Sequence, residues 1–451
     1  MILWLFACSG KSDPVVHDSA APADTGTVVE EGPPALPQPA DAEDLDPADG
    51  VVHFALEAAP FSYEVNGETV DGYAYNGQVP GPTIRAEVGD TVVVDFTNML
   101  ADTTTVHWHG LSVPNAMDGI TWLADPLLPG ESFTYTFTVD RAGTFWYHPH
   151  VDVDRQVDLG LYGAIVVEDP AEPVADRELL VVWDAWAETG AVEDQDHAAP
   201  DPADLVWTAN GVVAPMLELA AGERVRVRMI NAANTAYLDL RWPSMRQVAS
   251  DQGLLAVLAE PSSVVLAPGD RAEFEWLVDE GFTVETGLYT ASGGAAFGEA
   301  RPLLDVAVPA PGAVPEGLAW PFSGESPSAD AGQSDIVWVF SGGAVGEEWL
   351  INGEAYPDIT VQTLALGSEA VIEVRNLSAT EHPFHLHGHA FEVLSVDDMA
   401  PAARTVEDTL NLGIRQRARL RLVADNPGDW MAHCHLLQHE EGGMMTVLRV
   451  E

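Results

Sequence analysis

The chain has 451 residues and a formal net charge of −52, with 71 acidic side chains against 19 lysines and arginines. This length predicts more than one domain, and a hydrophobic content of 47% is sufficient for substantial cores. Because so acidic a surface repels a polyanion, the composition excludes nucleic acid as a partner.

The first eight residues are apolar and end in a cysteine, and Leu5-Phe6-Ala7-Cys8 resembles a bacterial lipoprotein signal in which the cysteine is acylated. We therefore expect residues 1–8 to direct export to the periplasm or cell surface. No uninterrupted apolar run approaches the roughly 20 residues that span a bilayer, so we expect membrane attachment only through a lipidated Cys8. Residues 9–50 are rich in Asp, Glu, Pro and Ala, which predicts a disordered acidic tether.

After residue 50, short runs rich in Val, Thr and aromatic residues alternate with Gly, Pro and Asn turns, a pattern typical of β-sandwiches and barrels. Three segments share one spacing, in which an Asn-Gly turn and a proline precede a glycine that lies nine residues before an asparagine. These glycine and asparagine pairs are Gly89 and Asn98, Gly222 and Asn231, and Gly367 and Asn376. The repeat predicts an all-β chain of three tandem Greek-key domains, at residues 51–170, 171–310 and 335–451.

Histidine pairs occupy equivalent positions in the first and third repeats, and the second repeat has none there. The four pairs are His107-Trp-His109, His148-Pro-His150, His385-Leu-His387 and His433-Cys-His435. In a strand, residues i and i+2 face the same side, so each pair presents two imidazoles together. We expect these eight imidazoles to line a shared metal site where the first and third domains meet.

Cys434 is the only cysteine apart from Cys8, and it lies between two of these histidines, ahead of His439 and Met444. A lone thiol forms no internal disulfide framework, so its surroundings indicate metal ligation. A thiolate with histidine and a weak axial methionine is the ligand set of a blue-copper electron-transfer centre.

Together these motifs resemble those of the multicopper oxidases, specifically the three-domain, laccase-like bacterial branch. The resemblance covers residues 51 to 451 and includes the segment His382-Pro-Phe-His385-Leu-His387-Gly-His389. It implies three cupredoxin-like domains and four copper ions, with no ligand in the middle domain. The type 1 copper would be held by His382, Cys434, His439 and an axial Met444, the type 2 copper by His107 and His385, and the type 3 pair by His109, His148, His150, His387, His433 and His435.

The family's acidic residues also have counterparts. Reduction of dioxygen to water consumes protons, which calls for carboxylates near the copper cluster. Asp118 and Glu440 match acidic positions of the family, and we assign both as proton-relay residues. Asp408 matches a family aspartate near the type 1 histidine, where it would orient the imidazole or accept substrate.

The resemblance implies an oxidase that takes single electrons from a reducing substrate and passes them to dioxygen. Laccase-like oxidation of phenols or aromatic amines competes with oxidation of Cu(I) or Fe(II) by a metallo-oxidase in metal tolerance. The chain has only 10 methionines and no methionine cluster beyond Met444-Met445, which favours laccase-like oxidation. The net charge of −52 favours cationic substrates instead. A non-catalytic scaffold and a nitrite reductase are two further alternatives, and the complete set of ligand residues argues against both.

Overall fold

The structure is a computed structural model, and it describes residues 33–46, 48, 50–123, 125–187, 205–292, 294–295, 300–330, 332–343 and 348–451. The predicted signal at residues 1–8, including Cys8, lies outside the described residues, as does the predicted tether from residue 9 to residue 32. Residues 34–451 form one compact unit. The exact boundaries of the three predicted domains therefore stay a prediction.

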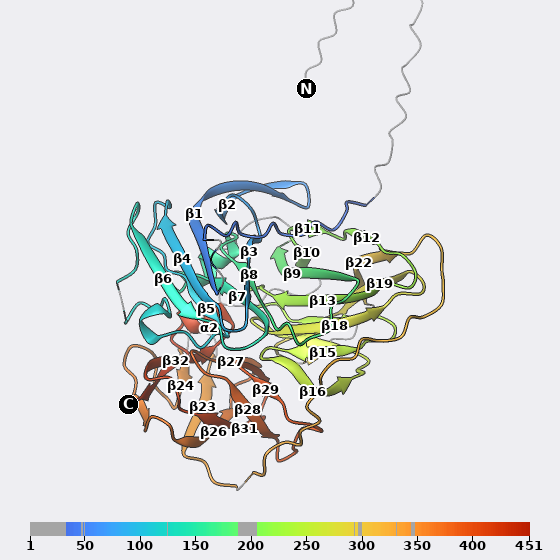
Figure 1. Cartoon of the computed structure of the whole chain (residues 1–451). Helices are drawn as coiled ribbons and strands as arrows, with labels where there is room; N and C mark the ends of the chain where they lie inside the picture. Colours follow the sequence, from blue (N-terminus) through green and yellow to red (C-terminus); the bar gives the residue numbers. More distant parts are fainter. Residues whose placement is uncertain are drawn as a thin grey trace, which may run out of the picture. The chain divides into compact units, whose positions relative to one another are not determined.

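The strands of this unit divide into three pairs of sheets in chain order, coloured from blue through green to red in Figure 1. The first pair consists of a sheet in the order β2-β1-β4-β6 and a sheet in the order β3-β8-β7-β5. The strand bounds are β1 Val51–Val65, β2 Glu68–Tyr75, β3 Gly81–Glu87, β4 Thr91–Asn98, β5 His107–His109, β6 Ser132–Thr138, β7 Gly143–His148 and β8 Gly163–Glu168.

The second pair consists of a sheet in the order β11-β10-β9-β13-β18-β15-β16 and a sheet in the order β12-β22-β19-β14-β17, beside a small hairpin of β20 and β21. The strand bounds are β9 Arg177–Ala187, β10 Leu205–Ala209, β11 Val212–Val213, β12 Met216–Glu218, β13 Arg224–Asn231, β14 Leu238–Arg241, β15 Gln247–Ser250, β16 Gly253–Ala259, β17 Val264–Leu266, β18 Arg271–Leu277, β19 Phe282–Gly287, β20 Tyr289–Thr290, β21 Gly294–Ala295 and β22 Arg301–Ala307.

The third pair consists of a sheet in the order β24-β23-β26-β31-β28-β29 and a sheet in the order β25-β33-β32-β27-β30. The strand bounds are β23 Ile336–Gly342, β24 Trp349–Ile351, β25 Gln362–Leu364, β26 Glu369–Asn376, β27 His382–Leu386, β28 Phe391–Val396, β29 Val406–Glu407, β30 Thr409–Leu412, β31 Arg417–Val423, β32 Gly428–Cys434 and β33 Met445–Val450.

The three pairs repeat one arrangement of neighbouring strands. In one sheet of each pair, two parallel strands are followed by an antiparallel one, as in β1-β4-β6, β9-β13-β18 and β23-β26-β31. The other sheet runs β3-β8-β7-β5 in the first pair, β12-β22-β19-β14 in the second and β25-β33-β32-β27 in the third. Such pairing of non-consecutive strands is typical of Greek-key sandwiches, and the prediction of a repeated all-β fold is confirmed.

The repeated asparagines make equivalent hydrogen bonds in all three pairs. Asn98, Asn231 and Asn376 are each 0% exposed. Each side-chain amide donates to carbonyl oxygens of the following loops, and each side-chain oxygen accepts from the backbone N–H two residues further on. The asparagine thus fixes the loop that leads from β4, β13 or β26 into the next strand, which explains the repeated sequence signal.

Each pair of sheets encloses its own apolar core. In β13, the alternate residues Val225, Val227 and Met229 are all 0% exposed and lie in the core of the second pair. Alternate residues of a strand face one side of the sheet, and burying each such side chain stabilises the fold by about 1.5–3 kcal/mol. The cores of the first and third pairs are separate clusters of the same kind.

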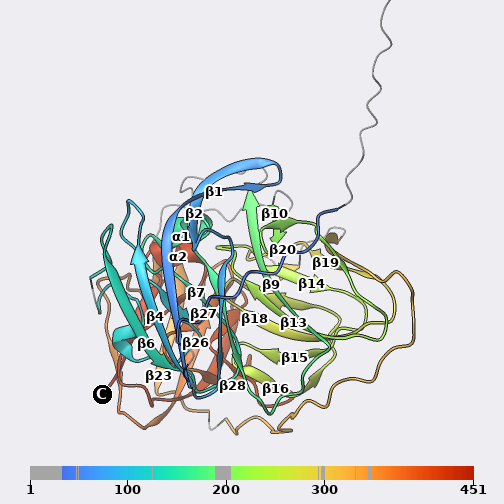
Figure 2. The same cartoon turned by 45° about the horizontal axis from the view of Figure 1, so that its top comes forward.

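Two short helices join the first and third pairs. The helices α1, Val153–Asp158, and α2, Leu437–Glu441, lie side by side in Figure 2 and are in contact. The side chain of Glu441 in α2 accepts a hydrogen bond of 2.8 Å from the backbone N–H of Val153 at the start of α1. Among the described residues, no helix combines the length and apolar composition that crossing a bilayer requires.

The last part of the predicted tether is ordered. Leu36 is only 9% exposed and packs in the core of the second pair, and its backbone N–H donates to the carbonyl of Met216 over 3.0 Å. Asp41 forms a bridge with Thr83 and accepts a 2.8 Å hydrogen bond from Arg85. The prediction of disorder up to residue 50 was wrong for this stretch, because the edge strands β12 and β3 supply partners that its composition does not reveal.

Replacing Asn231 with alanine should lower the melting temperature. The substitution leaves the carbonyls of Ala236 and Leu266 and the N–H of Ala233 without their partner, at a cost of about 1–3 kcal/mol for each unsatisfied buried group. We expect a fall of roughly 5 °C or more by differential scanning calorimetry. Asn66→Gly, at an exposed turn with φ of 51°, is the control and should change the melting temperature by less than about 1 °C. An Asn231→Ala protein as stable as the control would contradict this role of the repeat.

Candidate metal centre

Four strands bring the histidine pairs to one place. Strand β5 consists of His107, Trp108 and His109, and it pairs with β7 so that His107 lies opposite His148. In the third pair of sheets, β27 pairs with β32 so that His385 lies opposite His433. Because the side chains of opposite residues share one face of a sheet, each pairing places imidazoles from two strands together. The equivalent strands of the second pair, β14 and β19, contain no histidine.

The eight imidazoles of the four pairs form one buried cluster. His107 stacks on His387 and His109 stacks on His385, each with 3.8 Å between ring centroids. The Nε2 atoms of His387 and His433 are 3.2 Å apart. Three groups of imidazoles offer one nitrogen each within 4.8 Å of one another, namely His107, His109 and His148; His107, His150 and His387; and His385, His387 and His433. Each group has the spacing of a metal site, and the group of His107, His150 and His387 draws its histidines from both the first and the third pair of sheets.

Most rings of the cluster have one nitrogen fixed by the protein and the other left without a partner. Of the eight rings, five have one nitrogen in contact with an oxygen and the other buried without a hydrogen bond. These rings are His107, His109, His148, His150 and His385. Buried nitrogens without partners are rare in proteins, whereas an imidazole that binds a metal typically hydrogen-bonds through its other nitrogen. The donor set therefore fits a cluster of metal ions.

The protonation state of the rings also suits a metal. Burial, together with neighbouring imidazoles, lowers the pKa of His148 and of His387 well below its usual value. Both rings are therefore neutral near pH 7, and the neutral imidazole is the form that binds a metal.

A second group of donors lies in the core of the third pair of sheets. Nδ1 of His382 is 3.3 Å from Sγ of Cys434, and Nδ1 of His439 is 3.5 Å from the same sulfur. The two Nδ1 atoms are 3.2 Å apart, so both rings point at the thiol. Met444 is buried in the same core, and its backbone carbonyl accepts a hydrogen bond from the N–H of Cys434. The structure thus brings the donor atoms of His382, Cys434 and His439 to one point and holds Met444 next to Cys434 through the backbone.

Burial tunes the thiolate site as well. It raises the pKa of the Cys434 thiol far above its usual value and lowers the pKa of His382 to about 3. The thiol keeps its proton in this environment, and a metal ion that binds there has to displace it. Cys434 is also covalently joined to His433 and His435 of the imidazole cluster, so the two sites are connected through a short stretch of backbone.

Asp118 connects two rings of the cluster. Its Oδ2 lies 2.9 Å from Nδ1 of His387, and its Oδ1 lies 3.2 Å from Nδ1 of His107. The next residue, Gly119, has φ of 76°, and a Cβ there would lie 2.0 Å from the carbonyl oxygen of Val106. Glycine therefore allows the loop to approach β5 closely enough for Asp118 to reach the cluster.

Glu440 connects two other rings in the same way. Its Oε1 lies 3.1 Å from Nδ1 of His150, and its Oε2 lies 3.0 Å from Nδ1 of His433. The side chain is buried, and it is placed by α2, the helix that also carries His439. Both carboxylates assigned as proton relays are therefore in direct contact with the imidazole cluster.

Asp408 lies elsewhere than expected. Its Oδ1 is 3.1 Å from Nε2 of His109 and 3.4 Å from Nδ1 of His385, so it contacts the imidazole cluster instead of the type 1 histidine His382. Asp408 is 0% exposed, which rules out direct contact with a substrate at the surface. The expectation was wrong because position in the sequence does not show which side of β30 the carboxylate reaches.

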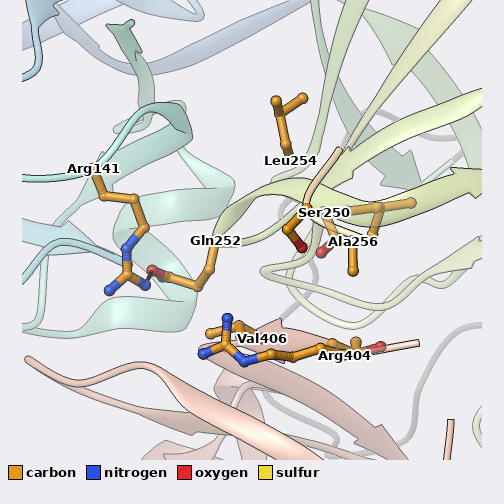
Figure 3. Close-up of a pocket in the computed structure, with 10 residues that line it drawn as sticks. Arg141, Ser250, Gln252, Leu254, Ala256, Arg404 and Val406 are labelled. Atoms are coloured by element: carbon orange, nitrogen blue, oxygen red, sulfur yellow. Dashed lines mark hydrogen bonds between the residues drawn. The ribbon is translucent and has the colours of Figure 1, made fainter. Parts of the chain in front are cut away.

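Residues of the second pair of sheets hold Asp408 in place. Nη1 of Arg271 donates to Asp408 over 2.8 Å, and its Nη2 contacts the other carboxylate oxygen. Burial alone would raise the pKa of the Asp408 carboxyl, but the Arg271 guanidinium holds it well below its usual range. Nε2 of Gln252 donates to the same carboxylate over 2.5 Å, and its Oε1 accepts from Arg141, as Figure 3 shows. Neither Arg271 nor Gln252 belongs to a motif that sequence reasoning could have singled out.

Taken together, a cysteine with two histidines and a methionine lies next to a cluster of eight histidines in an all-β chain. Thiolate, imidazole and thioether ligands of this kind define a blue-copper site, so the fold and site are those of a copper-dependent oxidase with a separate multinuclear centre.

Comparisons with known proteins lead to the same class. Residues 58–172 and 330–451 match family models described as multicopper oxidase. The multicopper oxidase MmcO of Mycobacterium tuberculosis is 33% identical over 457 aligned positions, which cover 90% of this chain and 89% of that protein. The chain therefore belongs to the multicopper oxidase family. It is a copper-dependent oxidoreductase, and four copper ions are typical of the family.

Two solved structures illustrate the range of the family. A multicopper oxidase from Campylobacter jejuni, described as a metallo-oxidase, is 26% identical with a TM-score of 0.77. The match covers 93% of this chain and 96% of that one. A laccase-like multicopper oxidase from Ochrobactrum sp., described as active towards lignin model compounds, is also 26% identical with a TM-score of 0.77. The match covers 92% of this chain and 100% of that one. The sheets are thus of the cupredoxin type that the resemblance implied.

Replacing Cys434 with serine should remove the blue colour and turnover but leave most of the remaining copper bound. A hydroxyl is a poor ligand for this site, whereas the eight histidines of the cluster are unchanged. We expect copper content to fall by about one ion per chain, measured by elemental analysis beside the visible spectrum. Cys8→Ser, the only other cysteine substitution that the chain offers, is the control and should keep both the blue colour and the copper content. A Cys434→Ser protein that stays blue would contradict the assignment.

Proposed function

We propose that this copper-dependent oxidoreductase is laccase-like, oxidising phenols or aromatic amines one electron at a time and reducing dioxygen to water. The observation that carries the proposal is the position of Trp349 at the start of β24. Its indole stacks on the imidazole of His439, with 3.6 Å between ring centroids and 25° between the ring planes.

The exposure of the ligands indicates where electrons enter. His439 is 8% exposed, whereas His382, Cys434 and Met444 are 0% exposed. Trp349 is partly exposed and covers the most accessible of these ligands. A reductant that approaches His439 from this side therefore meets the indole of Trp349.

An indole face favours an aromatic electron donor. Stacked or edge-on aromatic pairs contribute about 0.5–1.5 kcal/mol beyond the burial of their area. A second pair of partly exposed rings, Trp122 and Tyr356, lies nearby with 5.4 Å between centroids, and the N–H of Tyr356 donates to the carbonyl of Gly443 beside Met444. These rings support a docking surface for planar donors at this end of the third pair of sheets.

In this proposal each predicted ligand keeps its role. The type 1 copper would be held by His382, Cys434, His439 and Met444, the type 2 copper by His107 and His385, and the type 3 pair by His109, His148, His150, His387, His433 and His435. When bound, copper supplies the one-electron redox chemistry that the chain itself lacks. The protein orients the rings, excludes water from them and connects the sites through Cys434.

The carboxylates supply the protons. We assign Asp118 and Glu440 as the groups that hold and deliver protons during dioxygen reduction, because each contacts two rings of the cluster. Asp408 differs in its partners, because the Arg271 guanidinium also binds it while it contacts His109 and His385. We therefore assign Asp408 as a positioning residue for these two rings.

Oxidation of Cu(I) or Fe(II) is the second candidate function. The net charge of −52 concentrates cations near the surface, and the exposed Glu348 directly precedes Trp349. An exposed carboxylate next to Trp349 in the sequence is a suitable first contact for a metal ion. We place this function second because the indole, and not the carboxylate, lies on the ligand.

We also propose that the protein is exported to the periplasm or cell surface. This proposal rests on the sequence of residues 1–8 alone, where Cys8 would carry the lipid.

Oxygen uptake by the copper-loaded protein should be faster with a methoxyphenol than with Fe(II) or Cu(I), with free copper controlled. Trp349→Ala should lower kcat/KM for the phenol about tenfold through the lost aromatic contact and change that for Fe(II) by less than about threefold. Trp349→Phe retains a ring and should keep most of the phenol activity. Preferential oxidation of the metal ions, or an equal loss of kcat/KM for the phenol and for Fe(II) in Trp349→Ala, would favour the metallo-oxidase.

Replacing Asp118 with asparagine should slow dioxygen reduction and leave reduction of the blue copper by substrate unchanged. The amide keeps the shape of the side chain but cannot deliver a proton. Stopped-flow measurement of the two half-reactions separates them, and we expect at least a tenfold effect on the first. Asp125→Asn, an exposed residue of the same loop region, is the control. If neither half-reaction changes, the proton role of Asp118 is wrong.

A further inference from the structure

A cavity of about 210 Å³ opens beside the Asp408 contacts and away from the copper ligands. It lies between the loop that precedes β7, the β15–β16 hairpin and the segment that leads into β29. Its polar lining consists of Arg141, Ser250, Gln252, Ser323, Arg404 and Thr405. A water molecule occupies about 30 Å³ in the liquid, so the cavity has room for a ligand of several heavy atoms.

The charge of this lining is the reverse of that of the chain. Two arginines line the cavity, and none of the described residues that line it is acidic. The whole chain has 71 acidic residues against 19 lysines and arginines. Charges further away than about 8 Å are largely screened at physiological ionic strength, so the local potential depends on the groups close to the cavity.

The two guanidinium groups are available to a ligand. In Figure 3, Arg141 and Arg404 come from different parts of the ribbon and both extend toward Gln252. The hydrogen bond of Arg141 to Gln252 uses Nη1, and the contacts of Arg404 with Glu325 and Glu392 are long, at 3.3 and 3.4 Å, and use Nη1 and Nε. A guanidinium carries five N–H donors, so each group retains donors beyond these contacts.

The acidic groups behind the cavity cancel only part of this charge. Glu407 follows the lining residue Val406, and Asp251 lies between Ser250 and Gln252. Burial raises the pKa of Glu407 well above its usual value and the pKa of Asp251 to about 7. Glu392 is shared between Arg404 and Arg421, which leaves it only partly available to Arg404.

We propose that this cavity binds a small oxyanion, a carboxylate or a sulfate-type anion, between the guanidinium groups of Arg141 and Arg404. Planar guanidinium groups match the paired oxygens of such anions, and the hydroxyls of Ser250, Ser323 and Thr405 supply further donors. The site is separate from the copper ligands and does not depend on the identity of the reductant. Gln252 lies between the two sites, because it contacts both Arg141 and Asp408.

Calorimetric titration of the copper-loaded, full-length protein tests the proposal with two probes, sodium sulfate and sodium succinate, in a low-salt buffer. We expect saturable binding of at least one probe at about one site per chain. Arg141→Gln and Arg404→Gln should each weaken that binding at least tenfold, because a charge-assisted hydrogen bond is lost in each. Binding of both probes indicates a general oxyanion site, and binding of one identifies whether the tetrahedral or the carboxylate geometry is preferred.

Arg417→Gln is the matched control. Arg417 is a partly exposed arginine that pairs with the exposed Asp398 and lies outside the cavity lining. This control should bind as the unaltered protein does, and the melting temperature and copper content of every variant are measured to confirm folding. Absence of saturable binding of both probes, or binding that either cavity variant retains within about threefold, would overturn the proposal.

Discussion

The structure depends on one constraint, which is that eight imidazoles and a thiol are removed from water at a single place. A buried polar atom without a partner is costly, so each ring has to be satisfied on both sides. The protein satisfies the outer nitrogens of most of these rings with Asp118, Glu440, Asp408 and backbone carbonyls. The inner nitrogens are left for copper. The strands and loops around the cluster carry the groups that bind the outer nitrogens.

The second pair of sheets has a part in this arrangement although it holds no ligand. Asp408 is charged and fully buried, and a buried charge is tolerated only beside a partner of opposite sign. Arg271 of β18 provides that partner, and its own backbone N–H donates to Asp251 over 2.8 Å. The middle repeat therefore stabilises the carboxylate that orients His109 and His385, in place of contributing histidines of its own.

Much of the site could be predicted because its signals are local. The spacing from Asn98 to His107 and from Asn376 to His385 reflects equivalent loops and strands, and sequence spacing records such equivalence directly. The side of a strand that Asp408 reaches depends instead on packing between sheets far apart in sequence. For the same reason Arg271 and Trp349 were missed, and the ordering of Leu36 depends on an edge strand some 180 residues away.

The interleaving of ligands along the chain has a consequence for biosynthesis. The imidazole cluster draws on residues from His107 to His435, and the thiolate site is completed only at Met444, in the third repeat. A nascent polypeptide that ends before residue 433 has six of the eight cluster histidines and only His382 of the thiolate site, so it can complete neither site. Both ligand sets are therefore completed only after the third repeat has been synthesised.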